Sequence, residues 1–182
     1  AQGIGVLGDT GAGLCEHLGL DAGAVPVLIG TFGKAFGVNG GFIAASTTVI
    51  ETVRQKADTY IYTNPLSVAD CAAAEKAVDI CDSSEGLAIL AGLAARTRQF
   101  REGLSSLGLE SIPGPHPVVP LLVRDTDATH RLVRQLFDRG ILAVGLTFPV
   151  VPRGDETIRF QINGAHTEAD IDYALSVLAA SR

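Results

Sequence analysis

VPVLIGTFGKAFG stands at residues 25–37 and holds the pattern that sets the fold. Its first five residues are a short apolar run, which is typical of a buried strand in a parallel sheet. The glycine-bracketed turn that follows carries Lys34, and residues 41–45 (GFIAA) form a second short apolar run. Short strands combined with helical patterns further along the chain predict an α/β fold.

Lys34 is the most informative residue of this turn, because a Schiff-base lysine must lose its proton before it attacks an aldehyde. The neighbouring Phe32 and Phe36 would favour that loss by excluding water from the amine. Thr31 lies three residues earlier and offers a hydroxyl that can donate to a phosphate of the same ligand. A solvated loop lysine is the alternative, since that is the usual environment of this residue type. On these residues alone, both interpretations stay open.

Two glycine patterns suggest nucleotide binding, and both are weak. Residues 3–8 (GIGVLG) match GxGxxG, but a dinucleotide fingerprint needs a strand before it and a helix directly after it, and here more loop follows. The Gly-Lys pair ending at Lys34 resembles the end of a P-loop. However, Leu28 stands where the first P-loop glycine belongs, and Ala35 stands where Ser or Thr belongs. We reject the P-loop and keep a nucleotide-binding module as the least favoured hypothesis.

Periodicity and capping residues predict the remaining elements. Helices are expected from Thr47 or Thr48 onward, over 67–82, 84–107 and 128–139, and after a capping box formed by Thr167 and Asp170. Strands are expected over 118–123, 141–144 and 157–162. The helix over 128–139 should turn Leu136 and Phe137 inward.

Composition bounds the classes of function. The chain has 182 residues, is 47% apolar and has a net charge of -6 without a basic cluster, so nucleic acid and anionic membranes are not expected partners. No apolar run approaches the ~18 residues that a membrane span needs. The three cysteines and four histidines show no metal-ligand spacing, so no metal site is expected. The start of the chain lacks a basic segment, and we expect a cytoplasmic protein with reduced thiols.

The residues around Lys34 resemble the lysine motif of the α-oxoamine synthases, which are fold type I enzymes dependent on pyridoxal 5′-phosphate (PLP). The matching segments follow one another along the chain: AQGIGVLG at 1–8, GTFGKAFG at 30–37, GGFIA at 40–44, YTNPL at 62–66, FPVVPRG at 148–154, IRFQ at 158–161 and GAHT at 164–167. The resemblance implies that residues 1–95 are the C-terminal part of the mixed sheet in a large PLP-binding domain. Residues 96–182 would then form a small C-terminal α/β domain.

The resemblance also implies roles for individual residues. Lys34 would hold PLP as a Schiff base and act as the proton-transfer base, while Thr31 would bind the phosphate. Thr63 and Asn64 would approach the phosphate across the interface of a homodimer with shared active sites. Arg159 would clamp the carboxylate of an amino-acid substrate, a task that suits a planar and permanently charged group.

Arg159 lies between Ile158 and Phe160 in an alternating strand, so its side chain should face away from theirs. A surface ion pair is the alternative for this residue. His166 is interpreted as a structural residue at the entry to a helix.

Two departures from the family pattern affect the cofactor. Gln2 stands where the family usually has a histidine that hydrogen-bonds the phenolic oxygen of PLP; glutamine can donate such a bond but cannot titrate. The resemblance therefore implies altered cofactor electronics or a changed activity. The chain also begins after the place of the aspartate that pairs with the pyridine nitrogen, and it lacks the aromatic residue that stacks on the ring. We expect either a fragment of a longer enzyme or a degenerate chain.

The family condenses an amino acid with an acyl-CoA to give an α-amino ketone. FPVVP at 148–152 looks closest to glycine C-acetyltransferase (2-amino-3-ketobutyrate CoA ligase), and the 8-amino-7-oxononanoate synthases are nearly as close. Some of those synthases have an arginine near the position of Thr147 that suits a longer acid chain; its absence here favours a short acyl donor. A non-catalytic partner subunit is the second hypothesis.

Overall fold

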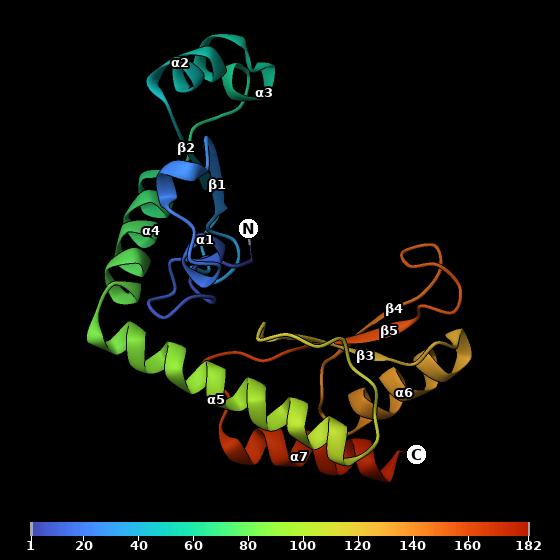
Figure 1. Cartoon of the computed structure of the whole chain (residues 1–182). Helices are drawn as coiled ribbons and strands as arrows, with labels where there is room; N and C mark the ends of the chain where they lie inside the picture. The colour runs from blue at the N-terminus through green and yellow to red at the C-terminus, as the bar shows by residue number, and fades with distance from the viewer. Residues whose placement is uncertain (1, 182) are drawn as a thin grey trace. The chain divides into compact units, whose positions relative to one another are not determined.

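The chain forms two compact units, Ala1–Leu90 and Ala91–Arg182. The computed structural model describes residues 2–181, except for the side chain of Ala22. A long helix, α5 (Ser84–Ser106), begins in the first unit and ends in the second (Figure 1).

The sheet of the first unit has two strands, β1 (Val27–Thr31) and β2 (Gly41–Ala45), which pair antiparallel. A parallel pair needs a long crossover, and the short connection between these strands cannot supply one. The prediction of a buried parallel strand is therefore wrong: the side chain of Ile29 is 63% exposed. Within residues 2–181 no further strand joins this sheet, which explains why its apolar side chains lack cover.

The first unit also contains the helices α1 (Leu14–His17), α2 (Thr47–Lys56), α3 (Asp58–Ile61) and α4 (Val68–Cys81) and the 3-10 helix η1 (Ala22–Ala24). Ser46 caps α2 through a bond from Val49 N–H to Ser46 Oγ of 3.4 Å, so the cap lies just before the predicted start. Among the described residues of this unit, the only apolar side chain in the buried core is Ala74. The first unit thus has no substantial core of its own.

The second unit has a three-stranded antiparallel sheet in the order β3-β5-β4, formed by β3 (Val118–Leu122), β4 (Val144–Leu146) and β5 (Thr157–Gln161). The helices α6 (Thr126–Asp138) and α7 (Glu168–Ala180), with the second half of α5, lie on one side of it (Figure 1). The core lies between the sheet and the helices, where the rings of Phe100 and Phe160 are 5.0 Å apart. The buried face includes Val119, Leu121, Ile158, Leu104, Leu136 and Leu178.

Two predicted details of the second unit are wrong. The strand expected from Ile141 begins only at Val144, because the Ile141 N–H still donates to the carbonyl of Leu136 at 2.9 Å and holds the chain at the helix end. Phe137 is 61% exposed, whereas Leu136 is fully buried. The helix therefore presents a narrower apolar face to the core than its sequence suggests.

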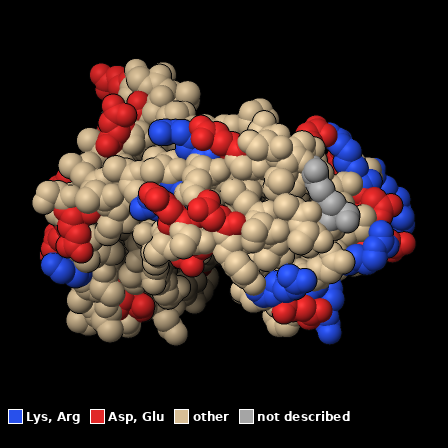
Figure 2. Space-filling view, turned by 90° about the horizontal axis from the view of Figure 1, so that it is seen from below, with Lys and Arg blue, Asp and Glu red and all other residues tan. Residues whose placement is uncertain are grey.

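The predicted capping box at α7 is confirmed. The Asp170 N–H donates to Thr167 Oγ1 at 3.2 Å, and the Thr167 N–H donates to Asp170 Oδ2 at 2.8 Å. No helix within residues 2–181 combines the length and apolar character needed to cross a membrane. Acidic and basic side chains are interspersed on the face shown in Figure 2.

Candidate cofactor site around Lys34

Lys34 lies in the connection between β1 and β2, and backbone hydrogen bonds hold this connection as a closed turn. The Phe32 N–H donates to the carbonyl of Gly40 at 2.9 Å, and the Val38 N–H donates to the carbonyl of Phe32 at 3.0 Å. The Gly37 N–H donates to the carbonyl of Lys34 itself at 3.2 Å. The position of Lys34 is therefore set by the two strands and not by a free loop.

The aromatic side chains of this turn pack on one another instead of around the lysine. The rings of Phe32 and Phe36 meet edge to face with centroids 5.8 Å apart, and the Phe32 ring lies 5.7 Å from that of Phe42. Lys34 itself is exposed in the described chain. The expectation that Phe32 and Phe36 desolvate the amine is not met, because these rings stiffen the turn and leave the amine open to a ligand.

Thr31 ends β1 and presents an unusual hydroxyl. Its Oγ1 is buried and has no hydrogen-bond partner among the described residues. Buried polar groups are almost always paired, since an unpaired one costs about 1–3 kcal/mol. An anionic ligand with several acceptor oxygens, such as a phosphate ester, would satisfy this donor. The residues present therefore fit a phosphate-bearing aldehyde, with Thr31 for the phosphate and Lys34 for the carbonyl carbon.

Gln2, Thr63 and Asn64, which are also expected at this site, are exposed residues of the first unit. Gln2 begins the N-terminal turn, and Ala1, the first residue of the matching motif, lies outside the described residues. Thr63 and Asn64 are exposed in the segment that leads from α3 to α4. Leu66 anchors that segment to the lysine turn: an ideal Cβ on Gly40 would lie 2.7 Å from Leu66 Cδ2. No local pattern in the sequence indicates this contact.

Arg159 belongs to the second unit, in the middle strand β5. Its neighbours Ile158 and Phe160 are 0% and 5% exposed, whereas Arg159 is half-buried. The expected alternation is confirmed, and Arg159 lies on the sheet face away from the core. A hollow of about 520 Å³ opens on that face, with Arg159, Arg124 and Asp155 among its lining residues. Thr31 and Lys34 thus share the first unit, while Arg159 lies in the second.

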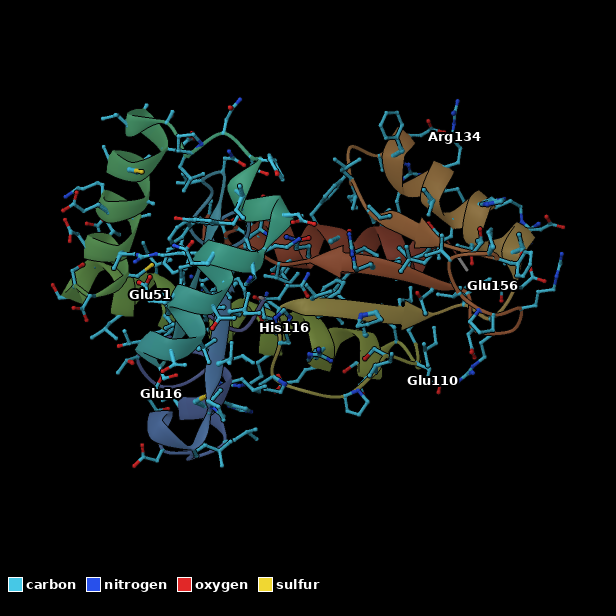
Figure 3. The ribbon with its side chains drawn as sticks, turned by 90° about the horizontal axis from the view of Figure 1, so that it is seen from above. Glu16, Glu51, Glu110, His116, Arg134 and Glu156 are labelled. Carbon is cyan, nitrogen blue, oxygen red and sulfur yellow. The ribbon has the colours of Figure 1, made fainter. Side chains whose placement is uncertain are left out.

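Glu156 is a buried acid that sequence analysis did not single out. Its side chain accepts bonds from Thr126 Oγ1 at 2.9 Å and from the Gly154 N–H at 2.8 Å, beside the N-terminal end of α6 (Figure 3). Its carbonyl accepts the N–H groups of Val123 and Arg124, both at 2.9 Å. The hydrogen bond from its own backbone N–H, followed by those from Thr126 and Gly154, lowers the pKa of this carboxyl against the effect of burial.

Arg124 is the second residue that the sequence did not reveal. It adopts a left-handed backbone conformation (φ 63°), which Glu156 holds through the backbone bond, and its guanidinium pairs with Glu110 at 2.7 Å. A non-glycine residue at positive φ has a steric cost. Here that conformation brings a second arginine to the hollow that contains Arg159. No sequence pattern indicates this conformation.

The fold and the lysine turn match the C-terminal part of the PLP-dependent proteins of fold type I. A high-resolution structure of SPT with PLP matches with a TM-score of 0.92 at 25% identity, over 100% of this chain and 45% of that one. The chain belongs to the aminotransferase class I and II family, whose family model matches residues 3–178. An 8-amino-7-oxononanoate synthase from Francisella tularensis shares the fold, with a TM-score of 0.86 at 23% identity, over 99% of this chain and 52% of that one.

Curated proteins of similar sequence include 8-amino-7-oxononanoate synthases. The 8-amino-7-oxononanoate synthase of Pseudomonas putida (strain GB-1) is 40% identical over 179 residues, which cover 98% of this chain and 45% of that protein. That of Thioalkalivibrio sulfidiphilus (strain HL-EbGR7) is 40% identical over 182 residues, which cover 100% of this chain and 46% of that protein. The chain therefore spans about half the length of the relatives it matches.

Proposed function

We propose that this chain supplies the lysine-bearing half of a PLP-dependent acyltransferase that condenses an amino acid with an acyl-CoA. The observation that carries the proposal is the buried hydroxyl of Thr31, which has no hydrogen-bond partner within residues 2–181 and lies three residues before the exposed amine of Lys34 on a hydrogen-bonded turn. The names of the relatives support the reaction class, since they are 8-amino-7-oxononanoate synthases.

The roles of the residues follow from their chemistry. Bound PLP supplies an electron sink for the charge left on the substrate α-carbon. Thr31 donates its hydroxyl hydrogen to the phosphate and fixes the cofactor's tail. Lys34 anchors the cofactor through Nζ and then, as the free amine, takes the α-proton of the substrate. Arg159 holds the substrate carboxylate with two parallel N–H donors, which orients the α-carbon. Gln2 donates to the phenolic oxygen and stays uncharged.

The rest of the active site is proposed to come from outside these 182 residues. The first unit would belong to the large PLP-binding domain and the second would form the small domain. The exposed apolar side chains of β1 and β2, such as Ile29 and Phe42, would be covered by further strands and helices of the large domain. Thr63 and Asn64 are proposed to serve the phosphate site of a partner subunit, which fits their exposure in the described chain.

We propose glycine, or an amino acid of similar size, and a short acyl-CoA as the substrates. The loop FPVVPRG at 148–154 supports a short donor through its resemblance to glycine C-acetyltransferase, although the curated relatives carry another name. In this loop the Arg153 guanidinium carbon lies 4.9 Å from the centre of the Phe148 ring, so the loop folds on itself.

A release assay for free CoA tests this function on the complete encoded polypeptide loaded with PLP. We expect turnover with glycine and acetyl-CoA that exceeds turnover with alanine and a longer acyl-CoA that ends in a carboxylate, and loss of both in Lys34→Ala. The opposite preference would contradict the short acyl donor. Cofactor binding without turnover on any pair would favour the non-catalytic partner subunit.

A further inference from the structure

The glycine-rich segment at residues 3–13 has no role in the function proposed above. It folds back on itself through backbone hydrogen bonds. The Gly5 N–H donates to the carbonyl of Gly11 at 2.7 Å, and the Gly13 N–H donates to the carbonyl of Leu7 at 2.9 Å. The helix that follows is only the single turn α1, so the segment lacks the long helix that a dinucleotide fingerprint opens. The segment is a compact loop that its own backbone hydrogen bonds close.

Gly5 brings this segment into contact with the lysine turn. It has a φ of 77°, and an ideal Cβ placed on it would lie 2.6 Å from the Cβ of Ala35. Ala35 follows Lys34 directly. A Cβ is fixed to its own backbone and cannot rotate away, so a side chain at position 5 must push the lysine turn itself. Only glycine permits both the conformation and the close approach.

The neighbouring residue Ile4 contacts the other end of the same region. Its Cδ1 would lie 3.1 Å from an ideal Cβ on Gly30, the residue just before Thr31. Two consecutive residues, Ile4 and Gly5, therefore contact the chain on both sides of the Thr31–Lys34 stretch.

We propose that Gly5 is a positioning residue that sets the place of the Lys34 turn relative to the Thr31 hydroxyl. The expected effect on PLP binding rests on the function proposed above. The contact between Gly5 and Ala35 does not depend on any cofactor. Extra atoms in a close-packed contact displace the backbone on one side or the other. Displacement of the lysine turn separates Nζ from the carbonyl carbon of a ligand whose phosphate is held at Thr31. Gly5 itself touches neither ligand nor reacting atoms.

Three variants of the complete encoded polypeptide separate this role from simple strain. Gly5→Ala adds the clash and the strained φ. The double variant Gly5→Ala/Ala35→Gly removes the clash but keeps the strain. Gly19→Ala is the matched control, because Gly19 has a φ of 65° in the same unit and no atom within 4 Å of an added Cβ.

Two measurements compare these variants. The first is hydrogen exchange of the Phe32 and Val38 amides in the cofactor-free protein, since both amides close the lysine turn. The second is the fraction of PLP that borohydride fixes to the protein after a fixed dialysis. We expect about tenfold faster exchange and about tenfold lower retention in Gly5→Ala than in the Gly19→Ala control. The double variant should match the control.

A double variant as impaired as Gly5→Ala would overturn the inference, as would a Gly5→Ala protein equal to the control. Should Gly5→Ala not fold, Ala35→Val enlarges the same contact without backbone strain and must speed exchange of the same two amides. If the unaltered protein fixes no PLP, the proposed function fails, while the exchange measurement still decides the role of Gly5.

Discussion

Thr31 and Gly41 face each other in the last pair of the β1–β2 register, and the connection between them carries Lys34. The pairing holds the buried hydroxyl of Thr31 at the base of the lysine turn, where it has no partner among the described residues. A donor of this kind predicts an acceptor that arrives with a ligand, because a buried hydroxyl is costly to leave unpaired.

Thr31→Val removes the hydroxyl and keeps the shape of the side chain. We expect the Kd for PLP in the complete polypeptide to rise about tenfold to a hundredfold, because a hydrogen bond to a charged group contributes about 1.5–3 kcal/mol. The thermal stability of the cofactor-free protein should not fall, since the lost hydroxyl has no hydrogen-bond partner in the described part of the chain. Absorbance titration and thermal melting measure the two effects. Thr31→Ser should bind like the unaltered protein; an unchanged Kd in Thr31→Val would refute the phosphate role.

Arg159→Ala should raise the KM for the amino acid about tenfold to a hundredfold and leave the KM for the acyl-CoA unchanged. The reason is that a guanidinium can grip a carboxylate with two parallel bonds, whereas its loss leaves the carboxylate without a partner. Steady-state kinetics of CoA release provide both constants. Arg159→Lys should recover only part of the loss. Equal rises in both constants would point to a structural role for Arg159 in β5.

Glu16 predicts a pH dependence for the glycine-rich segment. Burial opposes ionisation of its carboxyl, but bonds from the Thr10 hydroxyl, the Thr10 N–H and the Ala12 N–H together lower its pKa. A group whose pKa is lower in the folded state stabilises that state above its unfolded pKa, and the effect is lost as pH falls through the folded value.

We therefore expect the protection of the Thr10 and Ala12 amides against hydrogen exchange to fall in acid, below the ordinary carboxyl pKa. Exchange measured in pH steps, and corrected for the intrinsic rate, shows this directly. In Glu16→Gln the same amides should be less protected at neutral pH and lose the acid step. A step that persists in Glu16→Gln would assign the titration to another group.

Ile29→Thr should have opposite effects in two contexts. In the 182-residue chain Ile29 is 63% exposed, so a polar β-branched residue should keep β1 and reduce aggregation. In the complete polypeptide, where we propose that Ile29 is covered, the change should destabilise by about 2 kcal/mol. Light scattering and chemical unfolding measure these effects. Leu142→Thr, at an 85% exposed position of the second unit, is the control. Loss of stability no greater than in Leu142→Thr would contradict a covered sheet.

Local signals in the sequence predicted much of the second unit. Thr167 and Asp170 indicate the start of α7 because a capping box involves only residues within one turn. The position of Arg159 follows from strand alternation, which also needs no distant contact. The strand β4 was misplaced because the bond from Ile141 to Leu136 extends the helix end, and such tightening leaves no mark on hydrophobic periodicity.

The candidate site was only partly predictable, for the same physical reason. The motif around Lys34 involves only neighbouring residues, so the sequence alone could indicate it. The burial of the Thr31 hydroxyl and of Glu156, and the contact of Gly5 with Ala35, depend on residues that are distant in sequence. The prediction that β1 is buried was wrong because it assumed neighbouring strands that the described residues do not contain.

Borohydride reduction followed by peptide mapping tests the central claim most directly. The 182 residues contain three lysines, Lys34, Lys56 and Lys76, and peptide mapping distinguishes them from one another and from any other lysine of the complete polypeptide. In the complete polypeptide we predict a single adduct, on the peptide that contains Lys34, and none in Lys34→Ala. An adduct on Lys56 or Lys76 of equal yield, or no adduct in a folded protein saturated with PLP, would contradict the account.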